Sequence, residues 1–326
     1  MIAPATLADL PAFRIGHAQD AAAATGCTVI VAPAGATCGV AVRGGGPATR
    51  ETDLLRPENM IEAVHAVVLA GGSAFGLEAS CGVMDALAER GIGFQMAGAC
   101  VPIVTGACLF DLLVGAPAHP DKAMGREAAE RALADGYDGA AVAQGNVGAG
   151  TGATVGKLAA PEAAMKAGLG WSALRLGDLV VAALVAVNAL GCVRDSQGRW
   201  VAGVVGPDGR VADPLEVLAR GAAAQAGGEG GPVANTTLGV VLTNARLTKA
   251  HATKVASLAH DAYARAIKPV HTMNDGDTVF VFASGEVEAG ADVVGVLGAE
   301  AMEQAILSAV MSAEGAYGLP AARDLA

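Results

Sequence analysis

The sequence predicts an α/β protein on three observations. Short apolar runs that are typical of buried strands alternate with segments whose apolar residues recur at helical spacing. Glycine, which occurs 45 times, and proline separate most of these runs, and this indicates short loops and closely packed backbones. Hydrophobic residues make up 53% of the 326 residues and charged residues only 16%, so the chain can bury a substantial core.

The first clear unit is a strand, a turn and a helix. Residues 14–42 alternate short Val/Ala runs with Gly and Pro, as strands joined by tight turns do. Residues 66–70 then indicate a buried strand, and apolar periodicity predicts a helix over 73–90. The sequence around Ser73 resembles the Gly-x-Ser-x-Gly nucleophile elbow. Because Phe75 would crowd that sharp turn, we expect Ser73 to be the N-cap of the helix instead.

A glycine-rich run from Gly145 to Lys157 invites comparison with phosphate-binding loops. A Walker loop would need Gly at 151 and Ser or Thr at 158, where the chain has Thr151 and Leu158. The dinucleotide-binding pattern is met only loosely, without a following helix and spaced acid. We therefore expect a flexible, backbone-lined active-site loop. Lys157, at its end, is either a solvated lysine or a group close to the chemistry.

Residues 180–191 are apolar except for Asn188, which predicts a buried strand. A buried amide must find hydrogen-bond partners, so Asn188 is either structural or a fixed donor that stabilises an oxyanion. Residues 207–231 then predict a turn, a short helix over 215–224 and an exposed, flexible glycine-rich segment.

That segment leads into Asn235 and Thr236, where a loop becomes an apolar strand. Two interpretations are open. In the first, the pair simply caps a turn, as Asn-Thr pairs commonly do. Alternatively, the bond between Asn235 and Thr236 cleaves itself and leaves Thr236 as an N-terminal nucleophile, whose own α-amine serves as general base.

After Thr236 the order is strand, helix, strand, helix. Apolar periodicity predicts a helix over 248–267 and a strand over 278–282. Asp275 and Asp277 stand two residues apart before that strand, so in an extended chain both carboxylates point the same way. They form either a surface turn or a pair that orients a protonated amine, and His271 could belong to the same cluster.

Composition excludes several classes of protein. The net charge of −11 and the lack of a basic stripe argue against nucleic-acid and anionic-membrane partners. The six cysteines form no Cys-x-x-Cys pair and lie mostly in apolar runs, so we expect reduced thiols and no zinc site. The sequence offers no ligand cluster, so we expect no metal or organic cofactor. No signal peptide is evident, and the longest apolar run, 179–190, is too short to span a bilayer. We expect a cytoplasmic protein.

Six motifs occur in the order found in one peptidase family. The chain resembles the family that contains the L-aminopeptidase/D-esterase, the β-peptidyl aminopeptidases and the endo-type 6-aminohexanoate-oligomer (nylon-oligomer) hydrolase. The motifs that carry the resemblance are Arg50-Glu51-Thr52-Asp53-Leu54-Leu55, Gly71-Gly72-Ser73-Ala74-Phe75-Gly76-Leu77, Val101-Pro102-Ile103-Val104, Gly145-Asn146-Val147-Gly148-Ala149-Gly150-Thr151-Gly152, Val185-Ala186-Val187-Asn188 and Asn235-Thr236-Thr237.

The resemblance implies an αββα sandwich like that of N-terminal-nucleophile hydrolases. It also implies one domain, 1–326, that processes itself into a large fragment, 1–235, and a small fragment, 236–326. Together with the low charge and high apolar content, the resemblance favours a homo-oligomer of processed protomers, most readily a tetramer. It also implies that the protein binds a small-molecule or oligoamide substrate.

The resemblance also assigns roles to individual residues. It implies that Thr236 is the nucleophile, Asn188 the oxyanion-binding asparagine and Lys157 the site lysine. The aminopeptidase branch uses a serine nucleophile and a downstream Ser-x-acid pair, whereas this chain has Thr236 and the pair Asp275 and Asp277. In this respect it is similar to the nylon-oligomer hydrolase branch.

Three functions follow for testing. The first is a self-cleaving amidohydrolase or peptidase acting on small peptide-like or ω-/β-amino amides, including 6-aminohexanoate oligomers. The second is an acyltransferase of the ornithine-acetyltransferase kind, which would use Thr236 to pass an acyl group to an amine. The third is a non-catalytic assembly or small-molecule-binding protein that retains the fold and an intact chain.

Overall fold

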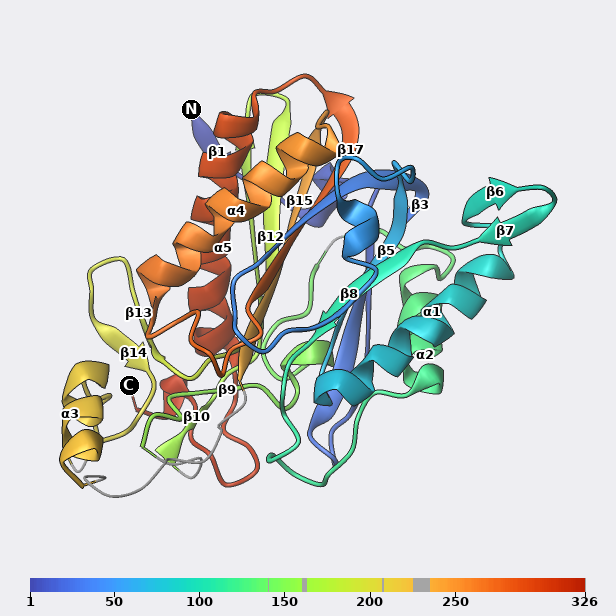
Figure 1. The fold of residues 1–326 in the computed structure, drawn as a ribbon. Coiled ribbons are helices and arrows are strands. Elements are labelled where there is room, and N and C mark those ends of the chain that lie inside the picture. The colour runs from blue at the N-terminus through green and yellow to red at the C-terminus, as the bar shows by residue number, and fades with distance from the viewer. Residues whose placement is uncertain (140, 160–162, 207, 225–234, 326) are drawn as a thin grey trace.

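A computed structural model describes residues 1–139, 141–159, 163–206, 208–224 and 235–325 (Figure 1). Its main strands form two sheets joined by one long strand, β3 (Thr25–Val42). The N-terminal half of β3 pairs with strands of the second sheet, and its C-terminal half pairs with β17 of the first sheet. The first sheet continues, in order from its outer edge, through β1 (Ile2–Pro4), β11 (Leu169–Leu176), β12 (Leu179–Asn188), β15 (Thr236–Ala245) and β17 (Thr278–Val287). The other strands of the second sheet are β2 (Arg14–Asp20), β5 (Val64–Ala70), β8 (Val104–Cys108) and β4 (Ala48–Arg50).

Helices cover the outer face of each sheet (Figure 1). Helices α4 (Lys249–Ala266) and α5 (Ala291–Ser312) pack on the first sheet, and α1 (Ala79–Ala88) and α2 (Lys122–Ala132) pack on the second. Three hydrophobic clusters fill the three spaces between these four layers. The architecture is therefore an αββα sandwich, as the sequence analysis predicted.

The buried strand β12 shows why its sequence is apolar throughout. All ten of its residues are buried. Val181, Val185 and their alternating neighbours pack toward α4 and α5, whereas Leu184 and Ala186 pack toward the second sheet. Glycines elsewhere allow close approach between layers. A Cβ on Gly170 would stand 2.0 Å from a backbone oxygen of α5, so glycine lets that helix lie directly on β11.

Several predicted elements are confirmed. The helix predicted over 248–267 is α4, and Thr248 caps it by accepting the N–H of His251 at 3.2 Å. The strand predicted over 278–282 lies within β17, and the short helix over 215–224 is α3 (Pro214–Ala224). Of the segment predicted to be exposed and flexible before Asn235, residues 225–231 lie outside the described residues.

The prediction for Ser73 is wrong. The helix begins with a 3₁₀ turn, Ser73–Glu78, before α1, and Ser73 makes no capping hydrogen bond. Its φ is +54°, a left-handed value. The N–H groups at this start are satisfied from elsewhere, because Gly72 donates to the Asp111 carboxylate at 2.6 Å and Ser73 donates to the carbonyl of Leu109 at 2.8 Å. Asp111, which follows the neighbouring strand β8, accepts the hydrogen bond that a capping residue would accept.

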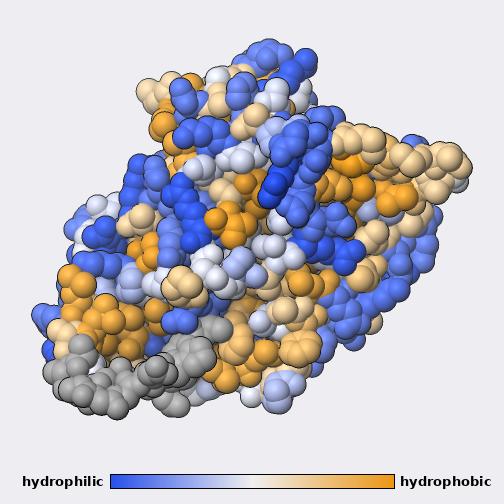
Figure 2. Space-filling view, in the orientation of Figure 1, coloured by the Kyte–Doolittle hydropathy of each residue, from blue (hydrophilic) through white to orange (hydrophobic). Residues whose placement is uncertain are grey.

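The remaining short elements lie mostly around the ends of the sheets. They are β6 (Phe94–Met96), β7 (Ala99–Val101), β9 (Thr154–Val155), β10 (Met165–Lys166), β13 (Cys192–Arg194), β14 (Trp200–Ala202), β16 (Ile267–Lys268) and the 3₁₀ turns Leu7–Asp9, Asp53–Leu55, Gly148–Gly150 and Ala322–Asp324. The hairpin of β6 and β7 projects from the body, and Figure 2 shows that its visible surface is mainly hydrophobic. Helix α5 is long and apolar enough to cross a bilayer, but most of its length is buried against the first sheet.

Candidate active site

Thr236 is the first residue of β15 and lies opposite Asn188, the last residue of β12, in the antiparallel register of these strands. The parallel neighbour β17 begins at Thr278, so Asp275 and Asp277 directly precede the strand on the other side of β15. Three strand ends therefore meet at one place. Thr236, Asn188 and both aspartates are buried there.

The Thr236 hydroxyl is held by the backbone of the loop before β17. The N–H of Gly276 donates to Thr236 Oγ1 at 3.0 Å. A Cβ on residue 276 would stand 2.5 Å from that oxygen, so only glycine allows this approach. The φ of Thr236 is +155°, which is a strained value for a β-branched residue. The strained N–Cα bond adjoins the peptide bond between Asn235 and Thr236.

The two carboxylates have separate partners. Asp277 Oδ1 accepts the N–H of Thr237 at 2.8 Å, and its Oδ2 faces His271 Nδ1 at 2.7 Å and accepts the His271 N–H at 3.0 Å. Asp275 Oδ2 accepts the N–H and the hydroxyl of Thr272, at 2.8 and 2.6 Å. Asp277 thus ties the start of β15 to the preceding loop, and His271 belongs to this cluster.

Lys157 and Asn188 are joined directly. Lys157 Nζ donates to Asn188 Oδ1 at 2.8 Å, to the carbonyl of Thr154 at 3.0 Å and to the Thr154 hydroxyl at 2.9 Å. Asn188 Oδ1 also accepts the N–H of Thr154 at 3.1 Å, which fixes its amide with the nitrogen turned away from Lys157. That nitrogen donates to the carbonyl of Phe110 at 2.8 Å and so uses one of its two N–H groups.

The charge state of Lys157 is set by its surroundings. Burial lowers the pKa of its amine to about 7, and repulsion from Lys166 acts in the same direction. The carboxylates of Asp275 and Asp111 oppose this by favouring the ammonium. A pKa near 7 means that a neutral amine, able to accept a proton, is well populated near neutral pH. The prediction that Lys157 lies close to the chemistry therefore has a chemical basis.

The segment that carries Lys157 differs from its prediction in one respect. It was expected to be a flexible loop, but residues 148–157 are buried and contain the 3₁₀ turn Gly148–Gly150 and strand β9. The N–H of Ala149 donates to the Thr28 hydroxyl of β3 at 3.1 Å, and the N–H of Gly156 donates to the carbonyl of Gly191 at 3.0 Å. These bonds pack the segment between the sheets and hold Lys157 in place.

The sequence pattern of peptidase family S58 matches residues 5–322 of the chain. The chain belongs to this family. An uncharacterized aminopeptidase of Mycobacterium tuberculosis (strain ATCC 25618 / H37Rv) is 38% identical over 98% of this chain and 97% of its own length. A 6-aminohexanoate-oligomer endohydrolase of Paenarthrobacter ureafaciens is 32% identical over 92% of this chain and 84% of its own length.

Solved structures show the same fold as this S58 peptidase. A β-aminopeptidase from Burkholderia sp. matches with a TM-score of 0.68 at 22% identity, over 100% of this chain and 94% of that chain. The L-aminopeptidase D-Ala-esterase/amidase from Ochrobactrum anthropi, a variant of the Ntn (N-terminal-nucleophile) hydrolase fold, matches with a TM-score of 0.66 at 17% identity, over 95% and 86%. The predicted fold class, the predicted family and the prediction of an amide-bond hydrolase are confirmed.

Two contributors to the candidate site were missed by the sequence analysis. Thr154 bonds both Lys157 and Asn188, and its only signal was its position three residues before Lys157. Gly276 supplies a backbone N–H to Thr236, and a glycine between two aspartates also reads as a turn. Every residue except proline carries a backbone N–H group, so the residue type does not predict such a contact and only the fold shows it.

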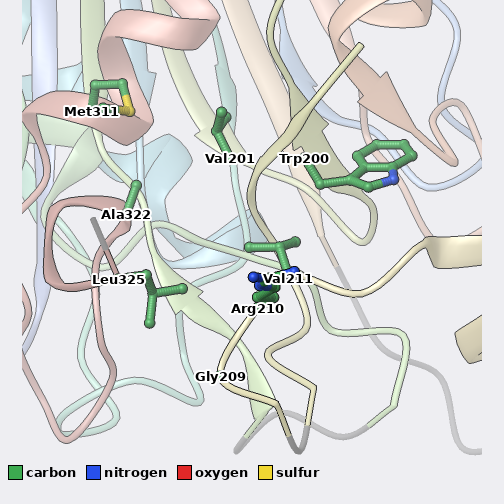
Figure 3. Close-up of a pocket in the computed structure, with 8 residues that line it drawn as sticks. All are labelled: Trp200, Val201, Gly209, Arg210, Val211, Met311, Ala322 and Leu325. Carbon is green, nitrogen blue, oxygen red and sulfur yellow. The ribbon is translucent and has the colours of Figure 1, made fainter.

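A separate pocket of about 380 Å³ lies beside β14 and the end of α5 (Figure 3). Its lining residues are Trp200, Val201, Gly209, Arg210, Val211, Met311, Ala322 and Leu325. None of the five predicted site residues lines it, so this pocket is distinct from the Thr236 cluster. Among the residues that the structure describes, no group of three or more His, Cys, Asp or Glu side chains could hold a metal ion.

Proposed function

We propose that the protein is a self-cleaving amidohydrolase in which Thr236 becomes an N-terminal nucleophile. The observation that carries the proposal is the contact of Gly276 N–H with Thr236 Oγ1, at a strained residue directly after Asn235. A hydrogen-bond donor on a hydroxyl oxygen stabilises negative charge that develops there, and strain next to a peptide bond raises the free energy of the uncleaved chain.

The first reaction is cleavage of the protein's own chain. Before cleavage Thr236 has no free α-amine, so another group must take the hydroxyl proton, and Lys157 is the buried amine joined to the site through Asn188. Thr236 Oγ1 then attacks the carbonyl carbon of Asn235. The C–N bond breaks as its nitrogen takes up a proton, and an ester forms. Water hydrolyses the ester to the carboxylate of Asn235 and free Thr236.

Later turnovers use the new N-terminus. An α-amine has an ordinary pKa of about 7.7 to 8.0, so near neutral pH it can accept the hydroxyl proton. In its ammonium form Lys157 favours the neutral form of this amine by charge repulsion, and Asp275 and Asp277 orient it. The second N–H of the Asn188 amide serves the tetrahedral oxyanion. No metal or organic cofactor enters these steps.

The substrates we propose are small peptide-like or ω-/β-amino amides, including 6-aminohexanoate oligomers. Support comes from relatives that are named as an aminopeptidase and as a 6-aminohexanoate-oligomer endohydrolase. The combination of Thr236 with Asp275 and Asp277, in place of serine with a Ser-x-acid pair, favours the oligoamide branch. The processed fragments, 1–235 and 236–326, stay together because β15 lies between β12 and β17 within the first sheet.

Intact-mass analysis under denaturing conditions tests the proposal. Scaling the 32.0 kDa chain by its residues 236–326 gives a fragment of about 9 kDa that begins Thr236-Thr237. Thr236→Val keeps the β-branched shape and removes the hydroxyl, so it should give an uncut, inactive chain. The matched control Thr237→Val, one residue along, should still be cut. Active wild-type protein with a single uncut mass would rule out Thr236 as an N-terminal nucleophile.

The reaction products distinguish an acyltransferase from a hydrolase. Processed protein supplied with an N-acetylated amino acid and glutamate would release free acetate as a hydrolase and acetylglutamate as a transferase. Predominant transfer would overturn the hydrolytic proposal while leaving the nucleophile unchanged. An intact chain that forms no covalent adduct with an amide-mimicking electrophile would favour a non-catalytic binding protein.

A further inference from the structure

A second buried lysine lies beside the proposed base. Lys166, on β10, is fully buried and pairs in register with Thr154 of β9. Its Nζ donates to three backbone carbonyls, those of Ala167 at 2.6 Å, Ala153 at 2.8 Å and Gly150 at 3.1 Å. Burying a charge is costly unless hydrogen bonds compensate it, and these three bonds compensate the burial of a Lys166 ammonium.

The contacts of Lys166 lead to Asn188 through one peptide group. The carbonyl between Ala153 and Thr154 accepts the Lys166 ammonium, and the N–H of the same peptide group donates to Asn188 Oδ1. That oxygen also accepts Lys157 Nζ. Lys166 therefore fixes the peptide group that sets which way the Asn188 amide faces.

The partners of the two lysines differ in kind. All three partners of Lys166 are carbonyl oxygens, which only accept, so they match the three N–H groups of an ammonium. A neutral amine would turn its lone pair toward a carbonyl. Lys157, by contrast, has the Thr154 hydroxyl among its partners, and a hydroxyl can donate as well as accept. Lys157 can therefore exist as the free amine in this geometry, and Lys166 cannot do so without losing a bond.

We propose that Lys166 is a positioning residue of the site, which holds Asn188 through the Ala153–Thr154 peptide and whose ammonium charge favours the neutral form of neighbouring Lys157. This rests on the proposed function, in which Lys157 takes the proton of Thr236. Lys166 touches neither Thr236 nor the bond that is cut. Its effect passes through Asn188 and through charge repulsion on Lys157.

The charged groups around Lys157 and Lys166 determine whether a substitution raises or lowers the pKa of Lys157. Lys157 faces Lys166, whose repulsion lowers its pKa, and Asp275 and Asp111, which raise it. Burial lowers the pKa of Lys166 to about 7 as well, whereas the carboxylate of Asp111 and the three carbonyl acceptors favour its ammonium form. Burial raises the pKa of Asp111 to about 6, and its carboxylate accepts the Gly72 N–H and the Thr25 hydroxyl. Removing the charge of Lys166 should therefore raise the pKa of Lys157, whereas removing that of Asp111 should lower it.

The test is the pH dependence of self-cleavage, measured on precursor made by cell-free translation and diluted into buffers on both sides of neutrality. The rate should rise with pH as Lys157 becomes neutral. Lys166→Met removes the charge and keeps the chain length, so this rise should move to higher pH by about 1 unit. A role in packing alone would change the rate at every pH and leave the midpoint where it was.

Lys166→Gln covers the case in which Lys166→Met fails to fold, because its uncharged amide still donates to the carbonyls and its midpoint should also move to higher pH. Asp111→Asn removes the opposing charge. Its amide keeps an oxygen for the Gly72 N–H and an N–H group for the Thr25 hydroxyl oxygen, so the turn should survive. The midpoint should then move to lower pH, opposite to Lys166→Met. The matched control is Lys249→Met, because Lys249 also donates to three carbonyls, at Leu54, Asn59 and Ile61, but lies beyond the far end of β15.

The outcomes separate the two proposals. Wild-type precursor that never splits would refute the proposed function. Normal splitting, with the midpoint unmoved in Asp111→Asn and in folded Lys166→Met, would overturn the role of Lys166 alone. Opposite shifts in these two variants, with no shift in Lys249→Met, are the result we expect.

Discussion

Gly276 donates its backbone N–H to Thr236 Oγ1 over 3.0 Å, and no side chain larger than hydrogen fits at that position. The contact brings the loop before β17 against the first residue of β15. It explains why a glycine stands between two aspartates, and it places a donor on the hydroxyl oxygen that we propose as the nucleophile.

Gly276→Ala should abolish self-cleavage while most of the fold persists. The added Cβ would stand 2.5 Å from Thr236 Oγ1, so either the hydroxyl or the loop must move. Gel analysis of the purified variant should show one uncut band. Gly290→Ala is the matched control, because a Cβ there meets no described atom within 4 Å, and it should be processed normally.

Asn188→Ala should slow self-cleavage by about 100-fold or more, the usual cost of losing an oxyanion donor. Because Asn188 is fully buried and bonds Lys157, Thr154 and Phe110, the variant should also lose stability. Thermal melting and cleavage rate should be measured on the same sample. A large loss of melting temperature with an unchanged cleavage rate would contradict the catalytic role.

His271→Gly should loosen Asp277 and slow cleavage. The variant removes the ring that contacts Asp277 Oδ2 at 2.7 Å, and glycine accommodates the φ of +59° at this residue. We expect a loss of roughly 1–3 kcal/mol in the free energy of unfolding from the hydrogen bond to a charged group, measured by urea titration. His251→Ala, at an exposed position of α4, is the control and should change neither quantity.

The rate of self-cleavage should rise with pH through about 7, because burial and Lys166 lower the pKa of Lys157 to that value and only its neutral form accepts a proton. The rate rises with pH because the protonated form of Lys157 cannot accept the hydroxyl proton of Thr236. Lys157→Met should remove this rise together with most of the rate. A wild-type rate that falls as pH increases through the same range would contradict the assignment of the base.

The homo-oligomer expected from composition remains a prediction. The projecting hairpin of β6 and β7 supports it, because Met96 and Val101 expose large apolar surfaces there. Analytical ultracentrifugation of wild type should show an assembly larger than one processed protomer, with a tetramer favoured. Met96→Asp should weaken that assembly, and a wild-type sedimentation mass of one protomer would contradict the expectation.

The sequence analysis located the strands and helices with strong apolar patterns, such as β12 and α4, since burial on one or both faces imposes those patterns. It also selected Thr236, Asn188, Lys157, Asp275 and Asp277 as candidate site residues, and the fold brings them to the same ends of β12, β15 and β17. It placed Ser73 wrongly because the N-terminal donors are satisfied by Asp111 and Leu109, which directly follow β8, 36 or more residues later in the chain.

What could not be predicted depends on long-range packing. The buried state of residues 148–157 follows from contacts with β3 and with Gly191, which no local pattern reveals. The carbonyl partners of Lys166 are backbone atoms, so their identity is absent from the residue pattern. Pairing between β12 and β15, more than 40 residues apart, is what brings Asn188 opposite Thr236.

The position of β15 and β17 inside the first sheet has a thermodynamic consequence for the processed protein that we propose. Residues 236–326 supply both of these strands and both helices of one outer layer, so neither fragment can complete that layer alone. Unfolding of the precursor releases one chain, whereas unfolding of the processed protomer releases two. After cleavage, therefore, refolding becomes an association reaction whose yield falls on dilution, and the melting temperature comes to depend on protein concentration.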